Sequence, residues 1–147
     1  MKPKSQIPAI GLALGLVAGL PAATPAPGES PADHLPPHTR QATWFGGRAD
    51  WSHDGKRILF LSKTFGDAME LDLATKAIRN RTAHYPHYGY TRALYLSNGD
   101  ILLSGPGQFD PQKPGEAREQ CWLYVLDKSR TKSAVPLGTK CSEGPAV

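Results

Sequence analysis

The stretch Arg48-Ala-Asp-Trp-Ser-His-Asp-Gly-Lys-Arg-Ile-Leu-Phe-Leu-Ser-Lys63 decides the fold. It predicts a short strand ending at Trp51, a tight turn at Ser52–Gly55 and an apolar strand from Arg57 to Ser62. Asp-Gly suits such a turn because glycine tolerates positive φ and aspartate can hydrogen-bond its own backbone. The run Ile58–Leu61 does not alternate with polar residues, so this strand is predicted to be covered on both faces.

A weaker copy of the stretch follows 44 residues later, at Arg92-Ala-Leu-Tyr-Leu-Ser-Asn-Gly-Asp-Ile-Leu-Leu103. Further on, Asp72 aligns with Asp127 at an offset of 55, so the second copy holds about 11 extra residues, a Gly- and Pro-rich insertion at 105–115. Each copy contains four candidate strands, at 48–51, 57–62, 68–73 and 77–81 and at 93–96, 100–104, 121–127 and 133–137. Four strands in a period of about 40 to 50 residues are typical of a propeller blade.

These motifs resemble the TolB-type, WD-repeat-like β-propeller repeat, in which an aromatic or apolar residue precedes Ser-Pro-Asp-Gly and an apolar strand. Trp51-Ser-His-Asp-Gly55 before Ile58-Leu-Phe60 departs only at His53, which replaces the proline. Tyr95-Leu-Ser-Asn-Gly99 is one residue short and lacks the Asp. The resemblance implies an all-β fold of four-stranded antiparallel blades over residues 43–147. Blade 1 would cover about 43–83, blade 2 about 84–141, and 142–147 would begin a third blade.

Two blades do not complete a propeller, since closed rings typically hold four to eight. Both outer sheet faces would then stay exposed. We therefore interpret the chain as a fragment, a truncated gene product or a partner in an assembly, in which missing blades or another chain close the propeller. A compact two-blade monomer is the less favoured alternative.

The N-terminus has the pattern of a secretory signal peptide over residues 1–23. Lys2 and Lys4 precede an apolar run at 7–20, and small residues follow. An uncleaved signal anchor is the alternative. Residues 24–42 are rich in Pro and Ala and predict a mobile linker. The chain is therefore predicted to be secreted, or periplasmic if bacterial, with no stable membrane span after cleavage.

Charge argues against a nucleic-acid partner. Removing Lys2 and Lys4 lowers the formal net charge from +4 to +2, because all 13 acidic residues lie beyond the cleavage region. No basic run accompanies this small charge.

Two local features predict covalent modification. Cys121 and Cys141 lie at mirrored positions about a hairpin centred near Thr131, and an exported protein favours their pairing as a disulfide. Two free buried thiols are the alternative. Asn80-Arg-Thr82 is an N-glycosylation sequon, relevant if the source is eukaryotic.

The best candidate site is the segment Ala83-His-Tyr-Pro-His-Tyr-Gly-Tyr-Thr-Arg92. Strands of a blade alternate in direction, so this link shares one end of the blades with the other long links, where binding concentrates on a rigid scaffold. Tyrosines offer ring faces and hydroxyls, and a guanidinium can pair with a carboxylate. The predicted ligand-binding residues are His84, His87, Tyr88, Tyr90 and Arg92. Simple packing of the blade interface is the alternative.

No catalytic set is complete. No Gly-x-Ser-x-Gly elbow is present, and His84-x-x-His87 without a third ligand is a poor metal signal. We therefore predict neither metal nor cofactor, and a binding scaffold for a carbohydrate or protein ligand without its own catalysis. The alternative is a fragment of a propeller enzyme, either a polysaccharide lyase, in which the two histidines would bind metal, or a hydrolase-associated propeller.

Overall fold

The computed structural model describes residues 26–141 and 144–145, and the predicted signal peptide lies outside them. The chain divides into two units after Ala42. In the first unit, the described part of the predicted linker contains a 3₁₀ turn, η1 (Pro31–His34). The Ser30 hydroxyl caps this turn by accepting from the Ala32 N–H at 3.2 Å.

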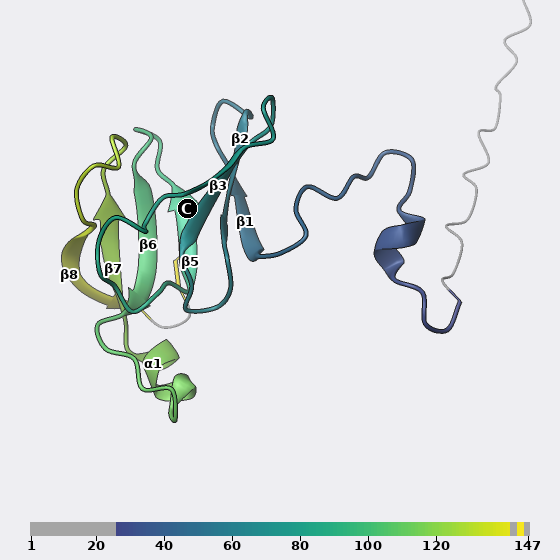
Figure 1. Cartoon of the computed structure of the whole chain (residues 1–147). Helices are drawn as coiled ribbons and strands as arrows, with labels where there is room; N and C mark the ends of the chain where they lie inside the picture. Colours follow the sequence, from purple (N-terminus) through teal and green to yellow (C-terminus); the bar gives the residue numbers. More distant parts are fainter. Residues whose placement is uncertain (1–25, 142–143, 146–147) are drawn as a thin grey trace, which may run out of the picture. The chain divides into compact units, whose positions relative to one another are not determined.

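The second unit is built from two four-stranded antiparallel sheets, each with its strands in sequential order (Figure 1). The first sheet comprises β1 (Gly47–Trp51), β2 (Arg57–Leu61), β3 (Ala68–Asp72) and β4 (Ile78–Asn80). The second comprises β5 (Arg92–Tyr95), β6 (Ile101–Pro106), β7 (Cys121–Leu126) and β8 (Val135–Cys141), with α1 (Pro114–Glu119) between β6 and β7. The predicted all-β fold of propeller-type sheets is confirmed, and the two sheets do not close into a ring.

The core lies between the two sheets. Leu59 and Leu61 of β2 pack against buried apolar residues of the second sheet, namely Ala93, Tyr95, Ile101, Leu103 and Leu126. Phe60 points to the other face of the first sheet and is 3% exposed. The Phe45 ring covers it edge-on, with ring centroids 5.7 Å apart. The prediction that this strand is covered on both faces is therefore confirmed.

Two polar contacts join the innermost strands of the sheets. The Tyr95 N–H donates to Asp50 Oδ2 at 2.7 Å, and Arg48 Nη1 donates to the Thr91 carbonyl at 2.6 Å. Arg48 lies in a β-bulge, where the register between β1 and β2 shifts between Gly47 and Asp50. These contacts tie the residue before β5 and the last residue of β5 to β1.

The connections separate to the two ends of the sheets (Figure 1). The short turns β1–β2, β3–β4, β5–β6 and β7–β8 lie at one end, which we call the turn end. In the first turn, the Ser52 hydroxyl donates to Asp54 Oδ1 at 2.6 Å, and Gly55 takes φ 66°. The links β2–β3, β4–β5 and β6–β7 enter or leave at the opposite end, which we call the loop end, and α1 projects there.

The cysteine prediction needs correction. The β7–β8 register places Cys121 directly opposite Cys141, as expected from the hairpin, but both cysteines are free thiols. Cys121 is fully buried, and its Sγ contacts the Ala117 carbonyl at 3.5 Å and the Thr91 hydroxyl at 3.6 Å. Its sulfur therefore contacts α1 and the residue before β5, and the predicted disulfide is not formed.

Candidate ligand-binding site

The predicted site segment begins at a turn fixed by Asn80. The side-chain oxygen of Asn80 accepts hydrogen bonds from the backbone N–H groups of Thr82 at 2.9 Å and Ala83 at 3.0 Å. Asn80 itself is exposed on the edge strand β4, whereas Thr82 is fully buried. The link therefore leaves the sheet at a defined angle.

Asp67, in the β2–β3 link, anchors the middle of the segment. Asp67 Oδ1 accepts from the Thr82 hydroxyl at 3.0 Å and lies 3.1 Å from His87 Nε2. The Gly89 N–H donates to His87 Nδ1 at 2.9 Å. Because Nδ1 accepts a hydrogen bond, Nε2 carries the proton and donates to Asp67. The imidazole is thus held from both nitrogens and presents one fixed face.

Tyrosines surround this imidazole. The Tyr90 ring lies over it, with ring centroids 4.8 Å apart, and the Tyr85 and Tyr90 hydroxyls hydrogen-bond at 2.9 Å. Burial raises the pKa of both phenols, so they remain neutral at physiological pH. Tyr90 is 3% exposed, whereas Tyr88 is 55% exposed. Tyr90 therefore builds the site, and the Tyr88 ring is free to contact a ligand.

Two hollows flank Tyr88, and together we call them the aromatic groove. The first has a volume of about 230 Å³ and reaches Tyr124 of β7 and Ala134 of the β7–β8 connection. The second has a volume of about 340 Å³ and reaches Lys63 and Phe109. The two hollows share His87, Tyr88 and Gly89, so they adjoin each other at the exposed ring.

The structure brings together three of the five predicted site residues, namely His87, Tyr88 and Tyr90. His84 Nε2 instead bonds the Lys132 carbonyl at 3.0 Å, which ties the segment to the chain between β7 and β8. Arg92 lines neither hollow. Its aliphatic stem instead lies against Gly144, so closely that a methyl group added to this glycine would collide with it. These two predicted residues therefore lie outside the groove.

The residues that the structure describes contain no candidate metal site. No three histidine, cysteine, aspartate or glutamate side chains gather there as a group that could hold an ion. Of the two histidines, His87 contacts one carboxylate and His84 a backbone carbonyl.

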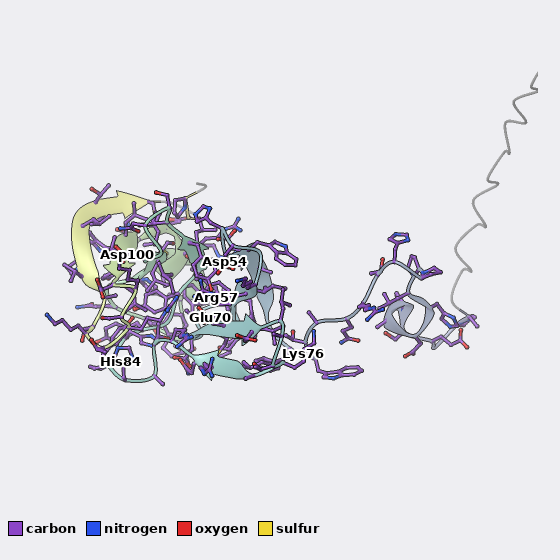
Figure 2. The ribbon with its side chains drawn as sticks, turned by 90° about the horizontal axis from the view of Figure 1, so that it is seen from above. Asp54, Arg57, Glu70, Lys76, His84 and Asp100 are labelled. Carbon is purple, nitrogen blue, oxygen red and sulfur yellow. The ribbon has the colours of Figure 1, made fainter. Side chains whose placement is uncertain are left out.

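A buried charge cluster lies between the sheets, and the sequence patterns did not predict it. Glu70 of β3 is 2% exposed and lies on the face of the first sheet that meets the second. Its carboxylate accepts from Arg81, from the Tyr95 hydroxyl at 2.7 Å and from Arg130 Nη2 at 3.0 Å. Arg57 lies 3.8 Å away and beside Glu70 in Figure 2. The sequence feature that could have indicated the cluster is a charged residue, Glu70, between the apolar residues Met69 and Leu71 of β3.

The charges decide the ionisation of Glu70. Burial opposes its ionisation, but the hydrogen bonds from Arg81 and Tyr95 and the charge of Arg130 outweigh burial and hold the pKa of Glu70 below its ordinary value. Burial beside Glu70 raises the pKa of Tyr95 above its ordinary value. Arg57 lies in β2 of the first sheet, and Arg81 directly follows β4. Tyr95 lies in β5 of the second sheet, and Arg130 lies in the turn between β7 and β8. The cluster therefore locks the two sheets together.

Comparisons with known proteins give a similarity to solved structures. No known protein family matches the sequence, and no curated protein matches it. Among solved structures, the chain is similar to TolB from Acinetobacter baumannii, with a TM-score of 0.47 and 21% identity. The match covers 67% of this chain and 22% of that one, so the chain spans about a fifth of the length of that protein. A similarity of this size assigns no function.

Proposed function

We propose that this chain is an exported interaction scaffold that binds a carbohydrate or protein ligand in the aromatic groove. The observation that carries the proposal is the exposed Tyr88 ring between two adjoining hollows, on a segment that the Asp67–His87 hydrogen bond anchors. A flat aromatic face with nearby hydroxyls suits stacking against sugar rings or peptide side chains. A preorganised loop also loses less conformational entropy when it binds.

Export is part of the proposal and rests on the predicted signal peptide. No helix among residues 26–141 and 144–145 is long and apolar enough to cross a bilayer. Mass spectrometry of the mature N-terminus tests export, and cleavage near Ala22 or Ala23 is expected. A mature chain that retains Met1 and Lys2 would contradict it.

We also propose that further blades, from this chain or another, cover the outer sheet faces. Trp51 is 59% exposed on the first sheet, and Val135 and Leu137 are 62% and 51% exposed on the second. Val135 and Leu137 are two residues apart on one face of β8, and exposed apolar side chains gathered on a face mark an interaction surface. Light scattering is expected to detect association, and a strictly monomeric chain at high concentration would argue against this part of the proposal.

A binding array tests the ligand proposal. Arrayed oligosaccharides and peptides are probed with the wild-type chain, Tyr88→Ala and Tyr88→Phe. We expect Tyr88→Ala to lose the signal and Tyr88→Phe to keep most of it, because the ring face provides the contact. Equal signals from the wild type and Tyr88→Ala, or no signal from any chain, would reject the groove as the site.

A further inference from the structure

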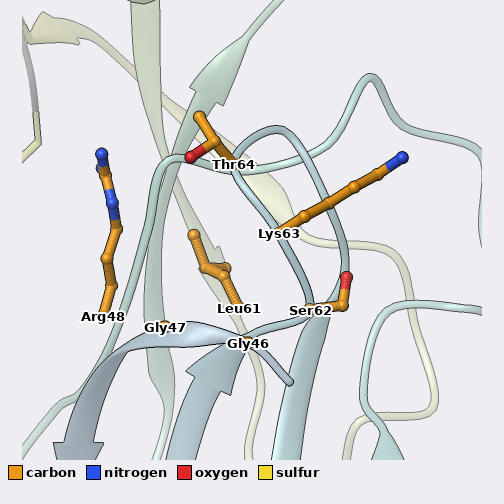
Figure 3. Close-up of a pocket in the computed structure, with 7 residues that line it drawn as sticks. All are labelled: Gly46, Gly47, Arg48, Leu61, Ser62, Lys63 and Thr64. Atoms are coloured by element: carbon orange, nitrogen blue, oxygen red, sulfur yellow. The ribbon is translucent and has the colours of Figure 1, made fainter. Parts of the chain in front are cut away.

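A third hollow continues the aromatic groove at the loop end of the first sheet, and Figure 3 shows its lining. We call it the basic pocket. It forms where the chain enters β1 and leaves β2, and it has a volume of about 200 Å³. Its lining residues are Gly46, Gly47, Arg48, Leu61, Ser62, Lys63 and Thr64. It shares Lys63 with the hollow that contains Tyr88, so the two lie next to each other.

The charged residues that line the basic pocket are all cationic. None of its lining residues is acidic, whereas Arg48 and Lys63 are cationic and Ser62 and Thr64 carry hydroxyls. One N–H of the Arg48 guanidinium donates a hydrogen bond to the Thr91 carbonyl. A guanidinium has five N–H donors, so four remain available. The Lys63 ammonium has no hydrogen-bond or ion-pair partner within the described part of the chain.

The backbone directs Arg48 at this position. Its φ of 58° is left-handed, a conformation that disfavours side chains larger than glycine's. The residue lies in the bulge of β1, and bulges re-aim side chains. In Figure 3, Arg48 stands at one side of the pocket, and Lys63 starts at the other side and extends away from Arg48, with Leu61 and Thr64 between them. The flexible four-carbon stem of lysine lets its ammonium serve either adjoining hollow.

We propose that the basic pocket binds one oxyanion, a carboxylate or a phosphate group, of a ligand that continues into the aromatic groove. This inference rests on the proposed function for the continuation of the ligand, whereas the pocket itself can be tested with free anions. The Arg48 guanidinium provides charge-assisted hydrogen bonds to such a group, no lining carboxylate competes with the anion, and a change of side-chain rotamer brings the Lys63 ammonium to it. The bonded guanidinium is already fixed in place, which favours planar, bidentate recognition of the anion.

The size of the pocket fits a small group. One water molecule occupies about 30 Å³ of liquid volume. A pocket of about 200 Å³ therefore accommodates a single oxyanion with a few water molecules, and a larger unit must extend beyond it. The direction that leads past Lys63 reaches Phe109 and Tyr88. A ligand with an acidic end and a stacking unit matches this sequence of surfaces.

Titration with free anions tests the inference. Sodium phosphate and sodium acetate are added separately to the isotopically labelled chain at constant ionic strength, with chloride as the balancing salt, and amide shifts are followed by NMR. We expect saturable shifts at the Gly46 and Gly47 amides. Lys63→Gln is expected to raise the dissociation constant about fivefold or more. Arg48→Lys keeps the charge but loses the bidentate fork, and it should also weaken binding.

The control is Lys76→Gln, which removes the same charge from the β3–β4 turn at the turn end (Figure 2). Its dissociation constant should match that of the wild type. Saturation with either anion supports the inference, and the tighter anion identifies the group. Shifts that do not saturate, or equal weakening by Lys63→Gln and Lys76→Gln, would overturn it.

The same titration on Tyr88→Ala separates this inference from the proposed function. Tyr88→Ala should lose the array ligand and keep its affinity for the free anion. Loss of the array ligand in Tyr88→Ala together with no anion binding by the wild type would overturn the basic pocket alone. Anion binding with an array signal that does not depend on Tyr88 would support the pocket and reject the groove.

Discussion

Replacing Glu70 with glutamine is expected to destabilise the packing of the two sheets strongly. The substitution keeps the size and shape of the side chain but removes the buried negative charge that faces Arg57, Arg81 and Arg130. Three guanidiniums then lie close together, and within the described residues only Arg57 keeps an acidic partner, the exposed Asp54 at 3.5 Å. Their mutual repulsion and desolvation remain in the folded state.

The exposure of the partners sets the magnitude. Removing one partner of a buried ion pair costs about 3–5 kcal/mol. The arginine side chains are 33%, 21% and 12% exposed, so water screens part of their charge. We therefore expect Glu70→Gln to lower the free energy of unfolding by about 2–3 kcal/mol. Tyr95→Phe removes one hydrogen bond to the carboxylate and should lower it by about 1.5 kcal/mol.

Urea unfolding at neutral pH measures both effects. The matched control is Glu119→Gln, which removes the same charge from an exposed position on α1 and should change the stability by less than about 0.5 kcal/mol. A loss below about 1 kcal/mol for Glu70→Gln would refute the cluster as the lock between the sheets.

The pH dependence follows from the lowered pKa of Glu70. A carboxyl group whose pKa is lower in the folded state stabilises the fold fully above its unfolded pKa, about 4.3, and loses this contribution as the pH falls through the folded pKa. The stability difference between the wild type and Glu70→Gln should therefore be constant near neutral pH and shrink below about pH 4. A difference that grows on acidification would contradict the assignment.

Two further predictions concern the thiols and the glycines. Burial raises the pKa of Cys121, whereas Cys141 is partly exposed, so a thiol reagent should label Cys141 first in timed mass spectrometry; faster labelling of Cys121, or none without reductant, would contradict the free thiols. Gly89 takes φ 82°, and an added methyl group would collide with the backbone of Phe65. Gly89→Ala should therefore lower the melting temperature and reduce the free energy of unfolding by about 2 kcal/mol. Gly115→Ala, in α1 with open space around it, should raise the melting temperature slightly; a gain from both substitutions would refute the strained loop.

Local patterns in the sequence were sufficient to predict the strands. The Asp-Gly turn and the apolar run after it place β2 within one residue, and the spacing of its copy places β6. The last strand was predicted to end at Leu137 but continues to Cys141. Pro136 and Gly138, which takes φ 70°, lie inside β8 and interrupt the usual strand pattern. The strand continues because pairing with β7 overrides that local preference.

Contacts across the sheets could not be predicted in the same way. Glu70 meets Arg81 11 residues away and Arg130 60 residues away, and only the docking of one sheet on the other brings the latter close. The composition of segment 83–92 pointed to the groove through His87 and Tyr88. It also included Arg92, whose side chain leaves the groove because β5 pairs Arg92 with Ser104 and fixes its face of the sheet.

Hydrogen–deuterium exchange with the best ligand from the array tests the central claim most directly, because it locates the binding surface along the whole chain. We expect the ligand to slow exchange in residues 83–92 and near Phe109, which line the aromatic groove, and to leave the turns at 52–55 and 97–99 unchanged. Protection confined to those two turns, with none in 83–92, would place binding at the turn end and contradict the account.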